Sequence, residues 1–382
     1  MKKQKICIIG GNLTGLITAI ALSKLNCQID LITGNVNQNH KSNRTIAISE
    51  NNLDFLNKLN ITKSLKKEMW PCSKMQLYTE IKSEKFSELF EINNSHKEKK
   101  IFYMLENSKI MKFMISKIKQ IKSISIKSHE KISEITSSGV LKSVKINNKE
   151  FKYNLIIICA GNNSNLVKNL FNNQTIEKSY REISITAILN HKSLKNNTAR
   201  QIFLNNEILA LLPISNSKTS IVWSVKDNMK KKNVFLLKKK IKLYAKNYLK
   251  NVSFATNIEH RELKFLVRNQ YFLDRILLFG DALHIVHPFV GQGFNMTLRD
   301  LISLKKILNK KINLGLDIGS SDILSEFSNE IKSGNFAFAL GVDFLKNSFS
   351  FKKLRDDTLK ILNKSNFAKD IFFNIADKGL KF

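Results

Sequence analysis

Consecutive apolar residues form two short runs, each followed by a glycine turn and then by a helical stripe. The first run covers residues 5–9 and is followed by Gly10, Gly11 and Gly15; the second covers residues 155–160. Unbroken apolar runs of this length are typical of parallel strands that are covered on both faces. The repeated order of strand, glycine turn and helix predicts a βαβ-type nucleotide domain assembled from noncontiguous pieces.

The mostly apolar stretch from Ile6 to Leu22 also has the outline of a secretory signal, because lysines precede it and it contains Ala19-Ile20-Ala21 near its end. Gly10, Gly11 and Asn12 interrupt its apolar middle, which favours a strand, a turn and a helix instead. No apolar run approaches the roughly 18 to 20 residues of a membrane span. The four cysteines form no CxxC pair, which favours a reduced, cytosolic compartment.

A different pattern begins in the middle of the chain. Apolar and polar positions alternate between residues 182 and 225, which predicts an antiparallel sheet in a separate substrate-side region. Leu237, Ile241 and Tyr244 then form a stripe opposite a lysine-rich face. This stripe favours a packed helix with a solvated face over a membrane-docking helix. The tail, residues 349–382, has a helical pattern whose apolar end predicts, in order of preference, core, dimer contact or lipid-facing surface.

Residue types that bind ligands are most densely gathered in residues 276–300. The apolar run 276–279 predicts a strand, and a helical stripe begins near Phe294. Between them stand Gly280, Asp281, His287, Pro288, Gly291, Gln292 and Gly293. We expect Asp281 to bind a ligand hydroxyl. We expect the later glycines to let backbone N–H groups approach a planar, electron-rich ligand where the helix begins.

The charge balance limits the choice of partners. Lysine and arginine number 63 against 31 acidic residues, which gives a net charge of +32. Such a charge attracts anionic surfaces, and both nucleic acid and phospholipid headgroups qualify. The chain has no arginine-rich stripe, aromatic interleaving or known nucleic-acid module. The composition therefore favours a membrane surface and predicts no nucleic-acid partner.

Two smaller features each allow two interpretations. His284 and His287 lie three positions apart, but without a nearby third ligand they are interpreted as structural or ligand-adjacent, and no metal is predicted. Arg44 stands before a predicted helix. Such an arginine is usually solvated surface, but it would neutralise a pyrophosphate if the first glycine turn binds a dinucleotide.

Taken in order, these motifs resemble the FAD-dependent aromatic hydroxylases of ubiquinone biosynthesis, within the para-hydroxybenzoate hydroxylase class. The resemblance covers nearly the whole chain. Its motifs are residues 10–15, 44–48, 105–107, 160–164, 209–213 with 221–224, and 280–295. The last two are the most specific to the subfamily.

The resemblance implies a set of FAD-binding residues and no catalytic acid–base pair. The implied binding residues are Gly10, Gly11, Gly15, Arg44, Gly280, Asp281, Gly291, Gln292, Gly293, Phe294 and Asn295, with Pro288, Gly291 and Gln292 beside the flavin. In such enzymes NAD(P)H reduces the flavin transiently, and oxygen then supplies a hydroxyl group to an electron-rich phenol. The protein's task is to exclude water, and Pro288 and the sheet around Trp223 would form part of that wall.

The resemblance also implies an α/β fold, with a Rossmann-like FAD-binding domain, an inserted antiparallel-sheet substrate domain and a C-terminal helical region. The expected domains are 1–70, 100–168 and 268–335 for FAD, 71–99 and 169–267 for substrate, and 336–382 for the helices. The implied substrate is a polyprenylated phenol. The implied location is cytoplasmic and peripheral on the inner face of the membrane, with an anionic membrane surface and either a ubiquinone-biosynthesis complex or a homodimer as partners.

Three positions depart from the pattern that the resemblance implies. Asn12 stands in place of a glycine, Thr33 in place of the acid that holds the adenosine ribose, and Ala160 in place of the aspartate of an Asp-Gly pair. A lost charge-assisted hydrogen bond costs about 1.5 to 3 kcal/mol, so two losses would weaken FAD binding about a hundredfold or more. The alternatives are therefore a non-catalytic or weakly flavin-binding accessory homologue and a hydroxylase of soluble substrates. The intact motif around Asp281 favours the enzyme.

Overall fold

The structure of the protein is a computed structural model. It describes residues 3–34, 42–93, 100–128, 132–161, 164–171, 175–231, 233–288, 291–349 and 351–379. Two parts of the predicted motifs lie outside the described residues: the pair 162–163 and the pair 289–290.

A six-stranded sheet contains both of the unbroken apolar runs. Its strands in spatial order are β19 (Phe272–Leu273), β20 (Ile276–Leu278), β12 (Leu155–Ile158), β1 (Gln4–Ile9), β2 (Cys27–Thr33) and β8 (Ile124–Ser128). β1 pairs in parallel with both β2 and β12, and only the edge strand β19 is antiparallel to its neighbour. Distant parts of the chain thus lie side by side, which confirms the predicted βαβ-type sheet.

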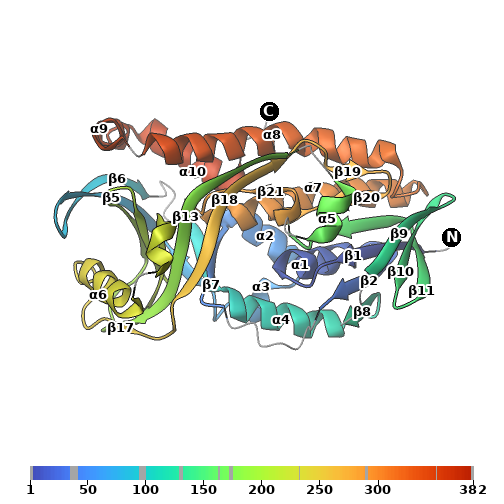
Figure 1. Ribbon diagram of the computed structural model, residues 1–382, viewed down its shortest axis with the longest axis horizontal. Helices are drawn as coiled ribbons and strands as arrows, with labels where there is room; N and C mark the ends of the chain where they lie inside the picture. The colour runs from blue at the N-terminus through green and yellow to red at the C-terminus, as the bar shows by residue number, and fades with distance from the viewer. Residues whose placement is uncertain are drawn as a thin grey trace.

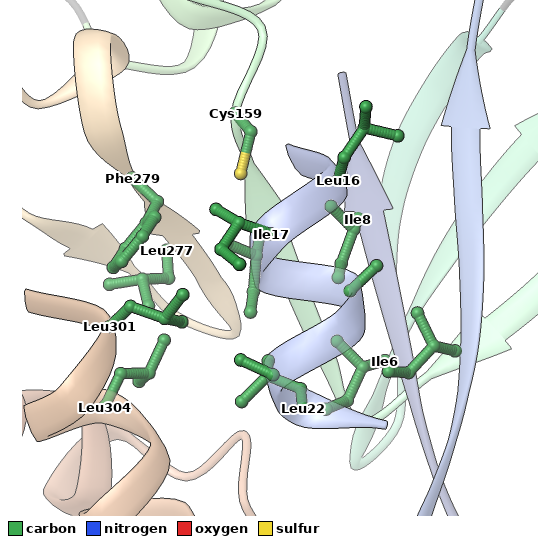
Figure 2. Close-up of a cluster of buried hydrophobic side chains, with 14 of the residues drawn as sticks. Ile6, Ile8, Leu16, Ile17, Leu22, Cys159, Leu277, Phe279, Leu301 and Leu304 are labelled. Carbon is green, nitrogen blue, oxygen red and sulfur yellow. The ribbon is translucent and has the colours of Figure 1, made fainter. Parts of the chain in front are cut away.

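Helices cover this sheet and form the main core with it. They include α1 (Leu13–Leu22), α4 (Asn107–Lys119), α7 (Gly293–Asn313) and α8 (Ser321–Ser348). Figure 2 shows Ile17 of α1 facing the Leu301 and Leu304 side chains of α7, and all three are buried. α1 contacts both α4 and α7, so nearly every side of this apolar helix is buried.

A second, strongly twisted sheet of nine strands forms the other half of the molecule (Figure 1). Its strands in order are β21 (His284–Ile285), β18 (Glu259–Arg268), β13 (Thr175–Asn190), β16 (Lys218–Lys226), β15 (Ile208–Pro213), β14 (Thr198–Phe203), β5 (Lys74–Lys82) and β6 (Lys85–Asn93), and β17 (Ser253–Phe254) pairs with β13. The predicted antiparallel sheet is confirmed, although β14 and β5 pair in parallel. α6 (Val234–Ala245) packs its apolar stripe on one face of this sheet around Trp223.

Two small sheets and the remaining short elements complete the description up to α8. They are β3 (Thr45–Ser49), β7 (Phe102–Glu106) and β4 (Trp70–Cys72); β9 (Ile132–Ser138), β10 (Leu141–Ile146) and β11 (Lys149–Tyr153); α2 (Glu50–Lys58), α3 (Thr62–Leu65) and α5 (Asn165–Leu170); and the 3-10 turns η1 (Asp227–Lys231) and η2 (Gly280–Ala282). The sequence shows an apolar helical face between Met104 and Ile118, but the helix itself begins only at Asn107. Residues 104 and 105 belong to β7, because their backbone pairs with β3.

The C-terminal tail forms α9 (Lys352–Asn363) and α10 (Asn366–Lys378), as its pattern predicts. Phe372 of α10 packs on Phe90 with ring centroids 5.6 Å apart, so part of the apolar end is core, whereas Phe367 is exposed. α8 runs through the expected domain boundary at residues 335 and 336. All four cysteines are free and buried. Among the described residues, no helix is both long and apolar enough to cross a membrane.

Candidate functional site

The first glycine turn brings α1 into close contact with the ends of the parallel strands. Gly10 has a φ of +124°, and a Cβ there would lie 2.7 Å from the carbonyl carbon of Cys159. A Cβ at Gly15 would overlap the carbonyl oxygen of Gly10. Both positions therefore require glycine, and together they place the start of α1 against the carboxyl end of β12.

The N-terminus of α1 has unsatisfied donors. In the described part of the chain, the Asn12 side chain at the N-cap makes no capping hydrogen bond, and no acidic residue stands in the first turn. The first-turn N–H groups of a helix have no partner within it, and the helix dipole adds partial positive charge there. This end of α1 is thus suited to an anionic group such as a pyrophosphate.

The segment around Asp281 packs directly on that helix start. Gly280 has a φ of +64°, and a Cβ there would lie 2.5 Å from Cγ2 of Thr14 in the first turn of α1. The guanidinium of Arg268 is buried and donates from Nε to the carbonyl oxygen of Ala282 at 2.7 Å. This hydrogen bond fixes the segment that contains Asp281. Asp281 itself is exposed. Its carboxylate is held beside the α1 N-terminus and remains open to a ligand.

Arg44 lies within electrostatic range of Asp281. Its side chain is exposed, yet the surrounding protein lowers the pKa of its guanidinium by desolvation. Repulsion from Arg261 also lowers the pKa, while Asp281 and Glu259 oppose the change. We call the start of α1, Arg44 and the segment around Asp281 the candidate cofactor site.

The second glycine turn lies against β3, the strand that begins directly after Arg44. Gly291 has a φ of +65°, and a Cβ there would lie 3.4 Å from the Cβ of Ala47 in β3, whereas Gly293 has open space around its Cα. Gln292 is buried, and within the described residues its Oε1 has no hydrogen-bond partner. A buried acceptor without a donor costs free energy unless a ligand or water supplies one.

Asn295 anchors this second turn to the parallel-sheet half. Its Nδ2 donates to the carbonyl oxygen of Ala47 at 2.9 Å, and its Oδ1 accepts from the Ser49 backbone N–H at 3.1 Å and from Asn52 Nδ2 at 2.9 Å. The side chain is thus committed to fixing α7 on β3. The backbone of Asn295 remains available to a ligand, although its side chain does not. Like Gly293 and Phe294, it lies in the first turn of α7, where no side chain caps the N–H groups.

The two histidines belong to two different side-chain pairs. His284 Nε2 lies 2.7 Å from Asp300 Oδ2, and Asp300 Oδ1 accepts from Asn335 at 2.9 Å. His287 Nε2 lies 3.5 Å from Glu182 Oε2, and Lys346 on α8 donates to the other oxygen at 2.7 Å. Both pairs tie the segment before Pro288 to neighbouring elements. No group of three or more His, Cys, Asp or Glu side chains in the described ranges could hold a metal ion.

The three departures lie around the first turn. Thr33 ends β2 with its side chain against Gly11, since a Cβ at Gly11 would overlap the Thr33 hydroxyl. Asn12 is exposed at the helix start, and Ala160 follows β12 beside Gly10. Only neutral groups thus stand where charge or a glycine was expected. Gly280, next to Asp281, packs on the start of α1, and Gly291 packs on β3, the strand that follows Arg44.

The sequence patterns did not indicate that two arginines lie at this site. Arg261 extends from β18 toward Arg44, and Arg268 holds the Asp281 segment. The chain has only eight arginines among its 63 basic residues. Arginine is the residue of choice for buried or planar hydrogen bonding, so its rarity here was a usable signal.

Comparisons with known proteins agree with this geometry. Residues 3–330 match the FAD binding domain family. The chain belongs to that family. It is 24% identical to the mitochondrial ubiquinone biosynthesis monooxygenase COQ6 of Dictyostelium discoideum, over 99% of this chain and 92% of that protein. It is 23% identical to the ubiquinone hydroxylase UbiM of Neisseria meningitidis over 60% of this chain, which spans only half of UbiM. The crystal structure of the p-nitrophenol 4-monooxygenase PnpA of Pseudomonas putida shares the fold, with a TM-score of 0.80 at 12% identity, over 100% of this chain and 99% of that one.

The residues present fit the FAD that this family binds. The exposed carboxylate of Asp281, the uncapped starts of α1 and α7, and the buried Gln292 Oε1, for which the described residues supply no donor, match the kinds of group that such a ligand carries. A diphosphate suits the helix start beside Arg44, and ribityl hydroxyls suit a carboxylate. The fit is weaker at the adenosine ribose, where Thr33 offers a hydroxyl in place of a charge.

Proposed function

We propose that this protein is an FAD-dependent monooxygenase that hydroxylates the aromatic ring of a polyprenylated phenol in ubiquinone biosynthesis, with NAD(P)H and oxygen as co-substrates. The observation that carries the proposal is the exposed carboxylate of Asp281 within electrostatic range of Arg44, in a segment that packs on the uncapped start of α1. The COQ6 and UbiM relatives support the choice of substrate class, because their names describe ubiquinone chemistry.

Each site residue has a physical task in this proposal. Arg44 and the start of α1 bind the diphosphate, while Gly10, Gly11 and Gly15 allow the close backbone approach. Asp281, beside Gly280, accepts hydrogen bonds from the ribityl hydroxyls. FAD, when bound, supplies the redox chemistry with NAD(P)H and oxygen.

The start of α7 provides the positive electrostatic environment at the ring. Gly291, Gln292 and Gly293 offer backbone N–H groups and a helix dipole, which stabilise negative charge on a reduced ring. Pro288, which precedes this turn, is partly exposed beside it. Fixed N–H donors need no reorganisation when negative charge develops on the ring, whereas water molecules have to reorient. The fixed donors therefore stabilise the reduced ring better than solvent water does.

A spectrum tests this function. The purified protein should show flavin absorbance after incubation with FAD, and the phenol substrate should stimulate NAD(P)H oxidation with formation of a hydroxylated product. A protein that binds FAD but neither oxidises NAD(P)H in response to phenol nor hydroxylates it would contradict the enzyme assignment.

A second candidate function is an accessory protein of a ubiquinone-synthesis assembly that binds flavin weakly. Thr33 and Ala160 favour the accessory role, because neither side chain carries a charge that could bind the adenosine part of FAD. Saturable FAD binding with turnover excludes this alternative.

The expected setting follows from the substrate. A polyprenylated phenol resides in a bilayer, so the protein works at the inner face of a membrane, with a synthesis complex or a homodimer as further partners. The division into an FAD domain, a substrate domain and a helical region stays a prediction that limited proteolysis can test.

A further inference from the structure

A cavity of about 540 Å³ opens on the nine-stranded sheet, where strands β13 to β16 meet the end of α8 and the start of α9. Its volume lies within the range of roughly 300 to 1,000 Å³ that is typical of small-molecule sites. Its lining comes from other residues than those assigned above to the cofactor. The cavity therefore requires an occupant of its own.

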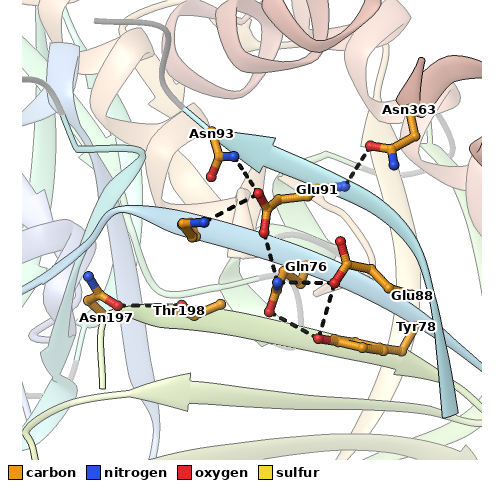
Figure 3. Close-up of polar contacts among 9 residues, drawn as sticks. Gln76, Tyr78, Glu88, Glu91, Asn93, Asn197, Thr198 and Asn363 are labelled. Carbon is orange, nitrogen blue, oxygen red and sulfur yellow. Dashed lines mark hydrogen bonds and ion pairs between the residues drawn. The ribbon is translucent and has the colours of Figure 1, made fainter. Parts of the chain in front are cut away.

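The helix α9 forms one wall of this cavity and is fixed at both ends. Arg355 lines the cavity and donates to the Thr79 hydroxyl of β5 at 2.6 Å. Figure 3 shows Asn363, at the other end of α9, accepting a hydrogen bond from the backbone N–H of Glu91 in β6 at 3.1 Å. Because strands and a tethered helix enclose the cavity, its shape is formed without a ligand.

A second wall of the cavity is apolar. The rings of Phe203 and Phe349 lie with their centroids 4.9 Å apart, and Leu204 and Ile208 also line the cavity. Phe203 and Leu204 are buried, whereas Phe349 and Ile208 are half-buried. This wall offers an apolar, partly aromatic surface to a ligand that carries an aromatic ring or a short hydrocarbon chain.

The strand β13 brings the carboxylate of Glu182 to the cavity through an irregular stretch of backbone. The register of β13 with β18 shifts between Ser179 and Glu182, and Arg181 has a φ of +51°. A positive φ is uncommon for a residue other than glycine and costs free energy. Irregularities of this kind redirect side chains and are frequent next to active sites. The backbone thus departs from a regular strand where it delivers Glu182.

Two donors hold the Glu182 carboxylate but leave it further acceptor capacity. Lys346 Nζ donates to Oε1 at 2.7 Å, and His287 Nε2 lies 3.5 Å from Oε2. An ionised carboxylate has about four acceptor sites on its two oxygens. Burial opposes ionisation, but the hydrogen bonds from His287 and Lys346 outweigh it and lower the pKa of the carboxyl group. Glu182 is therefore ionised at neutral pH and can accept another hydrogen bond from a ligand.

Glu182 also connects the cavity to the second glycine turn. Its partner His287 directly precedes Pro288, which leads into that turn. Another lining carboxylate, that of Glu207, is instead bound through both oxygens to Lys240, at 3.3 and 3.1 Å. A ligand that donates to Glu182 is thus held one side chain away from the segment before the second glycine turn.

We propose that Glu182 recognises the ring hydroxyl of a neutral phenol by accepting a hydrogen bond from it, while the hydrocarbon substituent of the ring lies against the apolar wall. The inference rests on the proposed function for the class of substrate. The proton stays on the phenol, because a phenol has a pKa of about 10 and a carboxylate with a lowered pKa is too weak a base to remove it. A site built to bind a hydroxyl group rejects an analogue that lacks the donor.

Calorimetric titration with two probes tests the proposal. The probes are 2-prenylphenol and its methyl ether, which has nearly the same shape but no O–H donor. They are titrated into the full chain with and without saturating FAD. We expect the wild type to bind the phenol at least about tenfold more tightly than the ether.

Variants assign this preference to Glu182. Glu182→Gln should bind the two probes about equally, because the ionised acceptor is lost. Glu177→Gln is the matched control, since this glutamate lies on the same strand and pairs with Lys264 at 3.3 Å but does not line the cavity, and it should keep the preference. Ile208→Trp fills the cavity and should weaken the binding of both probes.

A further variant covers the case in which Glu182→Gln does not fold. Glu182→Asp keeps the charge but withdraws the carboxylate by one methylene group, and it should also reduce the preference for the phenol. Wild type that binds neither probe, or binds both alike, overturns the proposal. A preference that survives in Glu182→Gln or Glu182→Asp also overturns it, as does unchanged binding in Ile208→Trp.

The same titrations separate this inference from the proposed function. If FAD binds and the phenol preference is absent, the role of Glu182 is rejected and the flavin assignment stands. If FAD does not bind, the proposed function is rejected, and the titration without FAD still decides whether Glu182 selects the phenol.

Discussion

The two ends of the candidate cofactor site share a backbone design but differ in their charges. At one end, the first turn, Gly10 and Gly15 allow contacts that no side chain would permit, yet the nearby Asn12 and Thr33 carry no charge. At the other end, the segment around Asp281, Gly280 has a positive φ and allows a close contact with Thr14, and the exposed carboxylate of Asp281 is present as well. The comparison teaches that the shape of a cofactor site and its affinity are separate properties. Shape is kept at both ends, and the charge is found at only one of them.

The largest expected effect removes the shape at the first turn. Gly15→Ala places a Cβ on the Gly10 carbonyl oxygen, so we expect it to destabilise the protein by about 3 kcal/mol or more, or to prevent folding. Gly34→Ala is the matched control, because nothing lies within 4 Å of its added Cβ. Urea unfolding compares the two. Equal stability of both variants would show that the first turn is not tightly packed.

The next effect removes the charge at the other end. Asp281→Asn keeps the size of the side chain but loses the carboxylate, and we expect FAD to bind roughly 10- to 100-fold more weakly. Flavin fluorescence titration measures the change. Asp274→Asn, at an exposed position paired only with Lys142, should bind FAD like the wild type. An unchanged affinity in Asp281→Asn would place the cofactor elsewhere.

A third change adds charge at the weak end. Thr33→Asp supplies a carboxylate beside Gly11, and we expect FAD to bind roughly tenfold more tightly. The FAD-free protein should lose stability, because the same carboxylate is buried without a partner. Thr33→Asn has the same size without the charge and should give no gain in affinity. If both variants bind FAD alike, a missing charge is not what distinguishes the two ends.

The smallest effect concerns the contacts behind the second turn. Burial opposes ionisation of Glu182, but hydrogen bonds from His287 and Lys346 outweigh it and lower the pKa of its carboxyl group. A carboxyl group whose pKa is lowered by folding stabilises the protein at pH values above its ordinary pKa. This contribution to stability is lost as the pH falls through the lowered pKa.

Lys346→Gln should therefore destabilise the protein by about 1 to 2 kcal/mol at pH 7. The difference from the wild type should shrink as the pH is lowered through the carboxyl range. Lys178→Gln is the control, since its pair with Asp343 is longer, at 3.6 Å, and half exposed. Urea unfolding at several pH values checks both. A difference that is constant with pH would show that Glu182 is not the group involved.

Backbone features of the site were readable in the sequence because they depend on local residue types. The unbroken strands, both glycine turns and the start of the helix near Phe294 follow from periodicity and from the freedom of glycine. Asp281 was readable for the same reason, since it follows a strand directly.

Side-chain tasks that depend on distant partners were not readable. Asn295 was expected at the flavin ring, yet its side chain reaches Ala47, Ser49 and Asn52, which are some 250 residues away in the chain. Arg261 lies within electrostatic range of Arg44 because the segment before Arg44 contacts β18, where the Asn43 backbone N–H donates to Glu259 Oε1 at 2.8 Å. Periodicity carries no information on such pairings, so these roles appear only in the folded chain.

Titration of the purified wild-type protein with FAD, followed by flavin absorbance and fluorescence, tests the central claim most directly. The account predicts saturable binding of one FAD per chain, weakened by Asp281→Asn and unchanged by Asp274→Asn. A protein that stays colourless and shows no flavin signal at saturating FAD would contradict it.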